Sequence, residues 1–230
     1  MLINRDDPST WLYKPTIIAH DVGRSRDRST AVVGGLCAHA GPLIGMETFV
    51  EFPLKSFGTD RAEALAAIDR QYNSMALIVA DLSNDPTYGE IFAKRFGPRA
   101  IGLHIGRSGD GMTWERRHFS GGSILVYNVG RTFLLEHFHN LLVSREIRFV
   151  DGPDARRAYE QLVNLDLELR DTGKTYVCSS GHDDLGLSCA MLAFMARHPH
   201  LPYHVRELEL LLTPPKPPRM TAREVWLGST

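Results

Sequence analysis

The chain has few cysteines and almost no net charge, and both facts narrow the classes of protein to consider. Its 230 residues include 3 cysteines, at Cys37, Cys178 and Cys189. An odd number without metal-ligand spacing argues against a disulfide scaffold or a zinc knuckle, so we expect a reducing compartment. Lys and Arg number 26 against 27 Asp and Glu. A nucleic-acid partner would therefore have to be held by local basic patches.

Long apolar runs, internal repeats and an ATPase phosphate cradle are also missing. No apolar stretch approaches the roughly 20 residues that span a bilayer, and the N-terminal residues show no signal-peptide pattern. We therefore expect a soluble, intracellular protein without membrane contact. Nothing fits G-x-x-x-x-G-K-[ST]. Hydrophobic residues at 43% and charged residues at 23% lie near globular averages, which excludes a disordered chain or a coiled coil.

Apolar patterning predicts one α/β domain. Strands are expected near 16–20, 30–33, 46–52, 75–80, 100–105, 123–127, 146–150 and 174–178. Helices are expected near 60–72, with Asp60 as N-cap, and near 88–96, 131–144, 154–169 and 182–197. Three strands followed by alternating helices and strands indicate a mixed sheet with helices on both faces.

The remaining segments complete the predicted organisation. The Gly-rich stretch from Gly106 to Gly122 is expected to be an exposed loop. Residues 1–15 would form an N-terminal extension, 16–200 the folded domain, and 201–230 a Pro-rich tail. The prolines between 213 and 218 cannot continue a helix or a central strand, so an extended arm is expected there.

Acidic residues stand where predicted strands end or a helix begins. Asp21 and Asp81 each directly follow an apolar strand, and Asp183 and Asp184 precede the last predicted helix. Ligands of open α/β sheets bind beyond the carboxyl ends of strands, and hard divalent cations prefer clustered oxygen ligands. Carboxylates from several elements that meet at one point would suit a two-metal site for phosphodiester cleavage.

Each of these acidic residues also has a structural interpretation. Aspartate is common at helix N-caps, so Asp183 or Asp184 would serve as a cap that favours the helix dipole. Asp81 would cap the turn at 82–86 by the same logic. Asp21 is the hardest to explain in this way, because it directly follows a strand expected in the sheet interior. The residues alone leave both interpretations open.

The segments around these residues resemble the nuclease domain of tailed-bacteriophage large terminase subunits. The matching segments are 20–30, 80–93 and 181–185, with 127–131 and 147–149 between them. Asp21 matches the catalytic aspartate of the first motif, Asp81 that of the second, and Asp183 with Asp184 the acidic pair of the third. The resemblance covers residues 16–197, nearly the whole chain.

This resemblance implies an RNase H-like fold and metal-dependent endonuclease activity on double-stranded DNA. Asp21, Asp81 and Asp183 would be catalytic and would hold two Mg²⁺ or Mn²⁺ ions, with Asp184 as a fourth ligand. The implied partners are duplex DNA and, in a packaging machine, an ATPase motor domain, a small terminase subunit and a portal. The implied location is the cytoplasm of a bacterial host cell.

The sequence departs from the family pattern in three places. The ATPase motif is absent, so the chain would be an excised or stand-alone nuclease domain, or a prophage remnant. The glycine-rich turn of the second motif is replaced by residues 83–86. The acidic residue often found one helical turn after the aspartate pair is replaced by residues 186–188, which would lower metal affinity.

Basic and neighbouring polar residues suggest how DNA would be held. Arg24, Arg26 and Arg28 flank Asp21, and Arg131 opens a predicted helix. These four are expected DNA-binding residues, although clustered arginines on a loop are equally often only solvated. His182 and Asp27 are candidates for orienting the metal ligands. Trp114, Arg116 and Arg117 are weaker DNA-contact candidates, because packing of the loop on the body is the simpler explanation for them.

Two other functions remain open at this point. A non-catalytic remnant that binds DNA or a packaging partner would keep the fold without the chemistry. An actin-like or sugar-kinase ATPase would use the Gly23 bend with Ser29 and Thr30 as a phosphate-binding hairpin. The chain is short for the second nucleotide-binding subdomain that such an ATPase needs.

Overall fold

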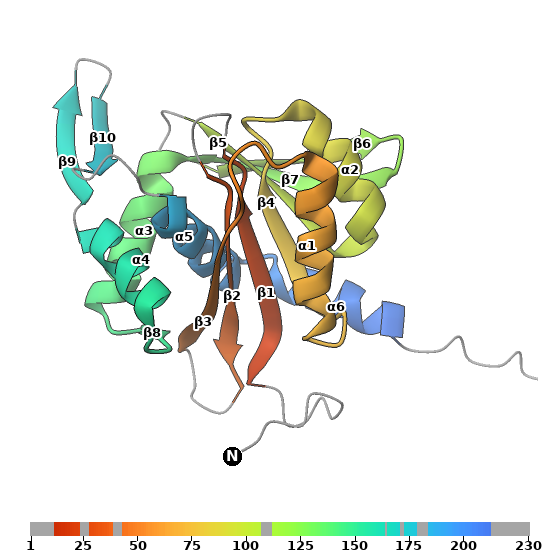
Figure 1. Ribbon diagram of the computed structural model, residues 1–230, viewed down its shortest axis with the longest axis horizontal. Coiled ribbons are helices and arrows are strands. Elements are labelled where there is room, and N and C mark those ends of the chain that lie inside the picture. Colours follow the sequence, from red (N-terminus) through yellow and green to blue (C-terminus); the bar gives the residue numbers. More distant parts are fainter. Residues whose placement is uncertain are drawn as a thin grey trace, which may run out of the picture.

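A mixed sheet between two layers of helices forms the body of the molecule (Figure 1). The computed structural model describes residues 12–23, 28–38, 43–106, 112–163, 165–170, 173–178 and 184–212. In this part of the chain, eight strands form the sheet in the order β6-β7-β5-β4-β1-β2-β3-β8. Their bounds are β1 (Tyr13–Asp21), β2 (Thr30–Cys37), β3 (Ile44–Glu51), β4 (Leu77–Asp81), β5 (Ala100–Gly106), β6 (Met112–Phe119), β7 (Gly122–Gly130) and β8 (Ile147–Phe149).

The central strands are buried on both faces, which explains their nearly continuous apolar sequences. β1 runs antiparallel to β2 and parallel to β4, and β5 continues the parallel series. Side chains alternate across the sheet, so Ile17 and Ala19 join one apolar layer and Ile18 joins the other. The two layers are therefore built from alternate residues of the same strands.

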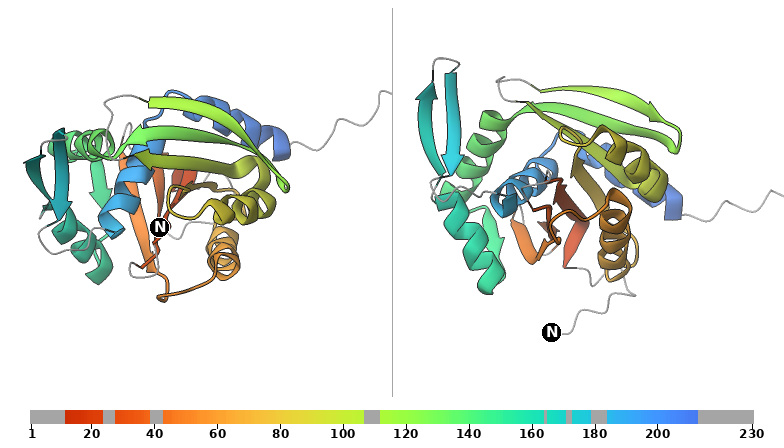
Figure 2. Two further views of the ribbon diagram at one scale, coloured as in Figure 1. Left: turned by 90° about the horizontal axis from the view of Figure 1, so that it is seen from above. Right: turned by 45° about the horizontal axis from the view of Figure 1, so that its top comes forward.

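Helices cover the two faces in separate groups (Figure 1, Figure 2). α1 (Gly58–Arg70) and α2 (Pro86–Phe96) pack on one face, and the one-turn 3-10 helix η2 (Gly97–Arg99) follows α2. The opposite apolar layer takes in α3 (Arg131–Val143), α4 (Pro153–Val163), α5 (Asp184–Ala196) and α6 (Leu201–Leu212). Residues 185–196 of α5 are all buried, as expected of a helix that is apolar all round. None of the described helices combines the length and the apolar character needed to cross a membrane.

Two sequence-based predictions of secondary structure are wrong. The loop expected from Gly106 to Gly122 contains β6, which pairs antiparallel with β7; its mixed polar sequence hides a strand that has no fully buried side chains. The second half of the helix expected at 154–169 is β9 (Leu165–Arg170), whose Leu-x-Leu-x-Leu alternation fits a strand. β9 pairs with β10 (Gly173–Cys178) in a separate two-stranded sheet, away from the main sheet (Figure 1).

Two predicted boundaries also change. α1 begins at Gly58, so Asp60 lies in its first turn and is not its N-cap; the cap position is held by Phe57, which supplies no side-chain hydrogen bond. The expected tail from residue 201 begins with α6, and Leu201 and Leu208 are buried in the main core. The prolines between 213 and 218 lie outside the described residues, and the division into extension, domain and tail stays a prediction.

Histidines attach α6 to the sheet. The Tyr127 hydroxyl of β7 lies 2.8 Å from Nε2 of His204 and 3.1 Å from Nδ1 of His200. The His200 backbone amide donates to Nδ1 of His198 at 3.0 Å. Burial, with a smaller effect of His200, lowers the pKa of both His198 and His204 from 6.5 to about 4. The neutral form of these histidines therefore belongs to the folded state.

We expect the free energy of unfolding to fall as the pH drops from 6.5 towards 4. In this window the unfolded histidines bind protons and the folded ones do not, so each contributes a slope of up to about 1.4 kcal/mol per pH unit. Replacing His204 with Gln keeps a hydrogen-bond partner for Tyr127 and removes one titrating group. Urea unfolding at several pH values should show a shallower pH dependence for this variant. His139→Gln, on the exposed side of α3, is the control, and equal slopes for His204→Gln and wild type would contradict the assignment.

Candidate active site at the carboxyl ends of β1 and β4

Asp21 and Asp81 end neighbouring parallel strands at the same level. β1 pairs with β4 in a register that aligns His20 with Ala80, and Asp21 and Asp81 are the next residues. Neighbouring strands lie about 4.8 Å apart, so this register brings the two residues side by side. Both are buried, with exposed fractions of 5% and 2%.

The two carboxylates also share one face of the sheet. Ala19 and Val79, two residues earlier in each strand, belong to the apolar layer that contains α5. His20 points to the other layer, where its ring contacts Phe52 and Tyr88. By strand alternation, Asp21 and Asp81 therefore lie on the α5 side. The sequence predicted that they would come together, and the strand register supports this.

Asp81 is buried and is held by a tight turn. Its Oδ1 accepts hydrogen bonds from the backbone amide of Ser83 at 2.9 Å and from the Ser83 hydroxyl. Burial raises the pKa of Asp81, and the bonds from Ser83 oppose this effect. Among the described residues, no Lys or Arg forms an ion pair with Asp81. The turn-capping interpretation is thus confirmed, and it leaves a buried carboxylate that a cation would stabilise.

Ser188 connects the start of α5 to the strand ends. Its hydroxyl accepts a hydrogen bond from the Asp21 backbone amide at 3.3 Å and lies 2.7 Å from the Thr30 hydroxyl. Asp184 opens α5 one helical turn before Ser188. The first turn of α5 is therefore held at the edge of the sheet that carries Asp21 and Asp81. Ser188, one of the three residues found in place of the acidic residue expected from the resemblance, links the start of α5 to β1 and β2.

Of the other eight predicted site residues, five lie outside the described residues and three are described. Asp183, His182, Arg24, Arg26 and Asp27 lie outside the described residues.

Asp184 is described only as the first residue of α5. Arg28 is exposed and forms an ion pair with Glu51 at 3.3 Å. Arg131 is the first residue of α3. Among the described residues, no group of three or more His, Cys, Asp or Glu side chains is arranged to hold a metal ion. A complete metal centre would therefore need the acidic pair before α5, in addition to Asp21 and Asp81.

Sequence analysis missed several polar residues close to these strand ends. Ser83 and Ser188 are single serines without a motif, and only the strand and helix packing shows what they contact. Arg61 lies inside the amphipathic pattern of α1 and reads as an ordinary surface residue, but it is 7% exposed. Asp85 caps α2 by accepting from the backbone amides of Thr87 and Tyr88. Its position directly before Pro86 was the sequence feature that could have predicted this capping role.

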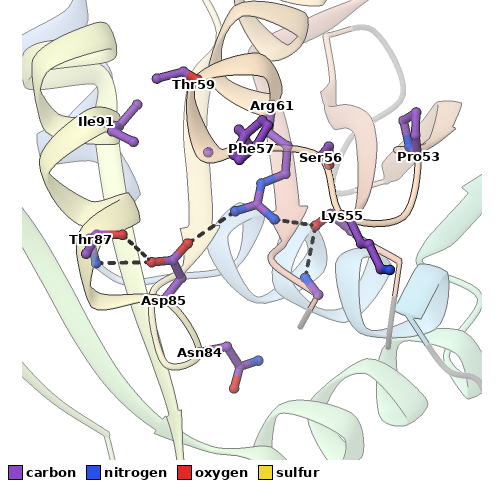
Figure 3. A pocket seen from close by; sticks show the side chains of 13 residues that line it. Pro53, Lys55, Ser56, Phe57, Thr59, Arg61, Asn84, Asp85, Thr87 and Ile91 are labelled. Carbon is purple, nitrogen blue, oxygen red and sulfur yellow. Dashed lines mark hydrogen bonds and ion pairs between the residues drawn. The ribbon is translucent and has the colours of Figure 1, made fainter. Parts of the chain in front are cut away.

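A pocket of about 660 Å³ opens at the same edge of the sheet, on the α1–α2 side (Figure 3). Gly23, just after β1, and Asn84 and Asp85, just after β4, form one part of its wall. The first turn of α1 forms another part. The edge thus carries two carboxylates on one face and a separate polar pocket on the other.

Three solved structures that are similar to this chain are terminase nuclease domains. The large terminase nuclease from thermophilic phage G20c matches with a TM-score of 0.50 at 16% sequence identity, covering 80% of this chain and 84% of that chain. The Mn-soaked terminase nuclease domain of human cytomegalovirus matches with a TM-score of 0.52 at 14% identity, covering 82% and 86%. The large terminase nuclease domain of bacteriophage SPP1, with bound Mn, has a TM-score of 0.49 at 15% identity and covers 79% and 86%.

At sequence identities this low, the matches bear on the fold. Neither a protein-family model nor a curated protein sequence matches the chain. The predicted fold class, an RNase H-like mixed sheet flanked by helices, is confirmed. The predicted resemblance to terminase nuclease domains is likewise confirmed in the three-dimensional structure.

We expect Ser188→Ala to lower the free energy of unfolding by about 1–2 kcal/mol, because two buried hydrogen bonds, to the Asp21 amide and the Thr30 hydroxyl, are lost. Chemical denaturation would measure this loss. Ser144→Ala is the matched control, since the Ser144 hydroxyl bonds the Leu141 carbonyl and Glu146 in a partly exposed turn. A Ser188→Ala protein as stable as wild type would mean that the hydroxyl does not hold α5 at the strand ends.

Proposed function

We propose that the chain is a metal-dependent endonuclease that cleaves double-stranded DNA. The observation that carries this proposal is the pair Asp21 and Asp81, buried side by side at the carboxyl ends of β1 and β4. Two buried carboxylates placed side by side repel each other, and a cation that joins them removes this repulsion. The fold of terminase nuclease domains, found with low sequence identity, supports the same function.

The donor set fits a hard divalent cation. Asp21, Asp81 and Asp183, with Asp184 as a fourth ligand, would hold two Mg²⁺ or Mn²⁺ ions, and the cytomegalovirus domain with this fold was soaked with Mn. Bound ions would supply an activated water and neutralise charge at the phosphate. The contribution of the chain's own residues is to orient the metal ligands. Ser83 fixes one oxygen of Asp81, and Ser188 holds the start of α5 against the end of β1.

The remaining implications of the resemblance are proposals of the same kind. His182 and Asp27 would orient the metal ligands. Duplex DNA would be delivered by an ATPase motor, a small terminase subunit and a portal, in the cytoplasm of a bacterial host cell. A non-catalytic binding domain is the competing proposal, and it predicts DNA binding without cleavage.

Supercoiled plasmid should be nicked or linearised when Mn²⁺ or Mg²⁺ is added, and chelation should stop the reaction. Asp21→Asn and Asp81→Asn should each abolish cleavage, because each removes a metal ligand while keeping the shape of the side chain. Gel electrophoresis of the plasmid measures the products. Asp151→Asn, at a position paired with Arg156 on the surface, is the control and should cleave normally. Intact plasmid after long incubation of the wild type with either metal would contradict the proposal.

DNA contact is proposed to depend on Arg24, Arg26, Arg28 and Arg131. With a formal net charge of -1, the chain has no long-range attraction for phosphate, so binding should be strongly salt-sensitive. Each lost phosphate contact should reduce the slope of log affinity against log salt by about 0.9.

The Arg24, Arg26 and Arg28 triple alanine variant tests this contact in a salt series, with Ca²⁺ present to allow binding without cleavage. Arg156→Ala, an exposed surface cation, is the control. A triple variant that keeps the wild-type slope would place the DNA path elsewhere, for instance along Arg116 and Arg117 of β6.

A further inference from the structure

The pocket between α1 and α2 has the features of an anion site. We propose that it binds the phosphate of a nucleotide, either a free mononucleotide or one that belongs to a DNA strand. The pocket is formed by residues other than the two strand-end aspartates. Its volume, about 660 Å³, falls within the range of small-molecule sites. Figure 3 shows Arg61 in the centre of the lining residues, with Lys55 and Phe57 beside it and Asp85 across from it.

Arg61 is a buried guanidinium whose donors are only partly used. Nη1 donates to the Ser29 hydroxyl at 3.1 Å, and Nη2 donates to Oδ2 of Asp85 at 3.3 Å. A guanidinium has about five N–H donors, and Nε has no acceptor among the described residues. The ring of Tyr88 lies below, 5.1 Å from the guanidinium carbon. Arg61 is thus fixed in one orientation at the pocket wall with donors to spare.

Unpartnered polar atoms gather around this arginine. The Tyr88 hydroxyl and Nε2 of His20 are also buried without a partner in the described part of the chain. The His20 and Tyr88 rings are 5.5 Å apart, so the three groups adjoin one another. Buried polar groups are nearly always hydrogen-bonded, and a cluster of exceptions calls for a water or ligand network.

The start of α1 contributes further donors. α1 has 13 residues, and its N-cap residue Phe57 offers no side-chain acceptor for the first-turn amides. Gly58 and Thr59, the first residues of the helix, line the pocket. An uncapped N-terminus attracts an anion through its free amides and its dipole. In α2, by contrast, Asp85 already caps the first turn.

The charge of the pocket is positive once its internal pair is counted. Asp85 uses Oδ1 for Thr87 and Tyr88 and Oδ2 for Arg61. Lys55 adds a second cation at the exposed rim, on a backbone with φ of 63°. The remaining positive charge, the helix N-terminus and the spare arginine donors all favour a phosphate.

Phe57 indicates why the phosphate would belong to a nucleotide. Its side chain is 75% exposed although it lines the pocket. Exposed aromatic side chains beside a phosphate site offer a stacking surface for a base. Ile91 on α2 adds a second apolar patch to the wall. Phosphate donors and an apolar face within one pocket match the two halves of a nucleotide.

The pocket lies close to the proposed catalytic carboxylates without sharing them. Gly23 is two residues after Asp21, so their Cα atoms are at most about 7 Å apart. A DNA strand that crosses this edge could place one phosphate near Asp21 and a neighbouring phosphate in the pocket. The binding proposal itself does not depend on nuclease activity, because a free mononucleotide tests it without cleavage.

The experiment measures the binding of two probes to the full chain. Deoxyadenosine 5′-monophosphate would be titrated by calorimetry, and a fluorescent 20-base-pair duplex, in Ca²⁺, by anisotropy. Lys55→Ala should weaken binding about tenfold, the loss expected for one charge-assisted hydrogen bond. Phe57→Asp should abolish binding, because the new carboxylate caps α1 and repels phosphate; a raised melting temperature would show that this variant is folded. Lys94→Ala, which removes an exposed cation from the far end of α2, is the matched control.

Each outcome decides the proposal. Losses seen with the mononucleotide identify a free-nucleotide site, and losses seen only with the duplex identify a contact to a strand phosphate. Wild-type protein that binds neither probe would overturn the inference, as would Lys55→Ala and Phe57→Asp proteins that bind both probes normally. Mononucleotide binding that persists while plasmid stays intact would count against the nuclease proposal alone.

Discussion

The parallel pairing of β1 with β4 is the constraint on which the rest of the site depends. Its register aligns His20 with Ala80, and from this one alignment three arrangements follow. Asp21 and Asp81 emerge side by side on the α5 face, His20 enters the opposite apolar layer, and the chain leaves both strands at one edge. Because strand alternation has a period of two, a slip by one residue would turn both carboxylates away from α5. Burial of apolar residues on both faces prevents that slip.

Sequence patterns predicted the parts of this arrangement that have strong local signals. The apolar runs before Asp21 and Asp81 predicted both strands, and the turn chemistry after β4 indicated capping by Asp81 as one of its two possible roles. Where such signals are missing, segments were assigned wrongly or were given other boundaries. β6 has no fully buried side chain. Its sequence therefore lacks the alternation of apolar and polar residues that would predict a strand. α6 precedes a run of prolines that suggested an extended tail, yet Leu201 and Leu208 complete the core.

The functional residues that the sequence did not predict share one property. Their structural roles depend on contacts with residues far away in the sequence. Ser188 contacts the ends of β1 and β2, more than 150 residues away. Arg61 bonds Ser29 from the loop before β2 and Asp85 from the cap of α2. A single serine or arginine on a helix carries no local indication of such contacts. Only the packing of α1 and α5 on opposite faces of the same strands brings them to the edge.

Several local rules of stability are broken at this edge. Asp81 is a buried carboxylate whose pKa is raised, α1 starts without a side-chain cap, and three adjoining polar atoms are buried without partners. Each departure costs free energy, and a charged ligand of the appropriate sign would relieve the buried carboxylate, the uncapped start of α1 and the unused donor of Arg61. A cation suits the carboxylate face, and a phosphate suits the α1–α2 face. A nucleic-acid strand with divalent ions, the ligand of the proposed function, would satisfy both faces at once, because it would bring the anion and recruit the cation.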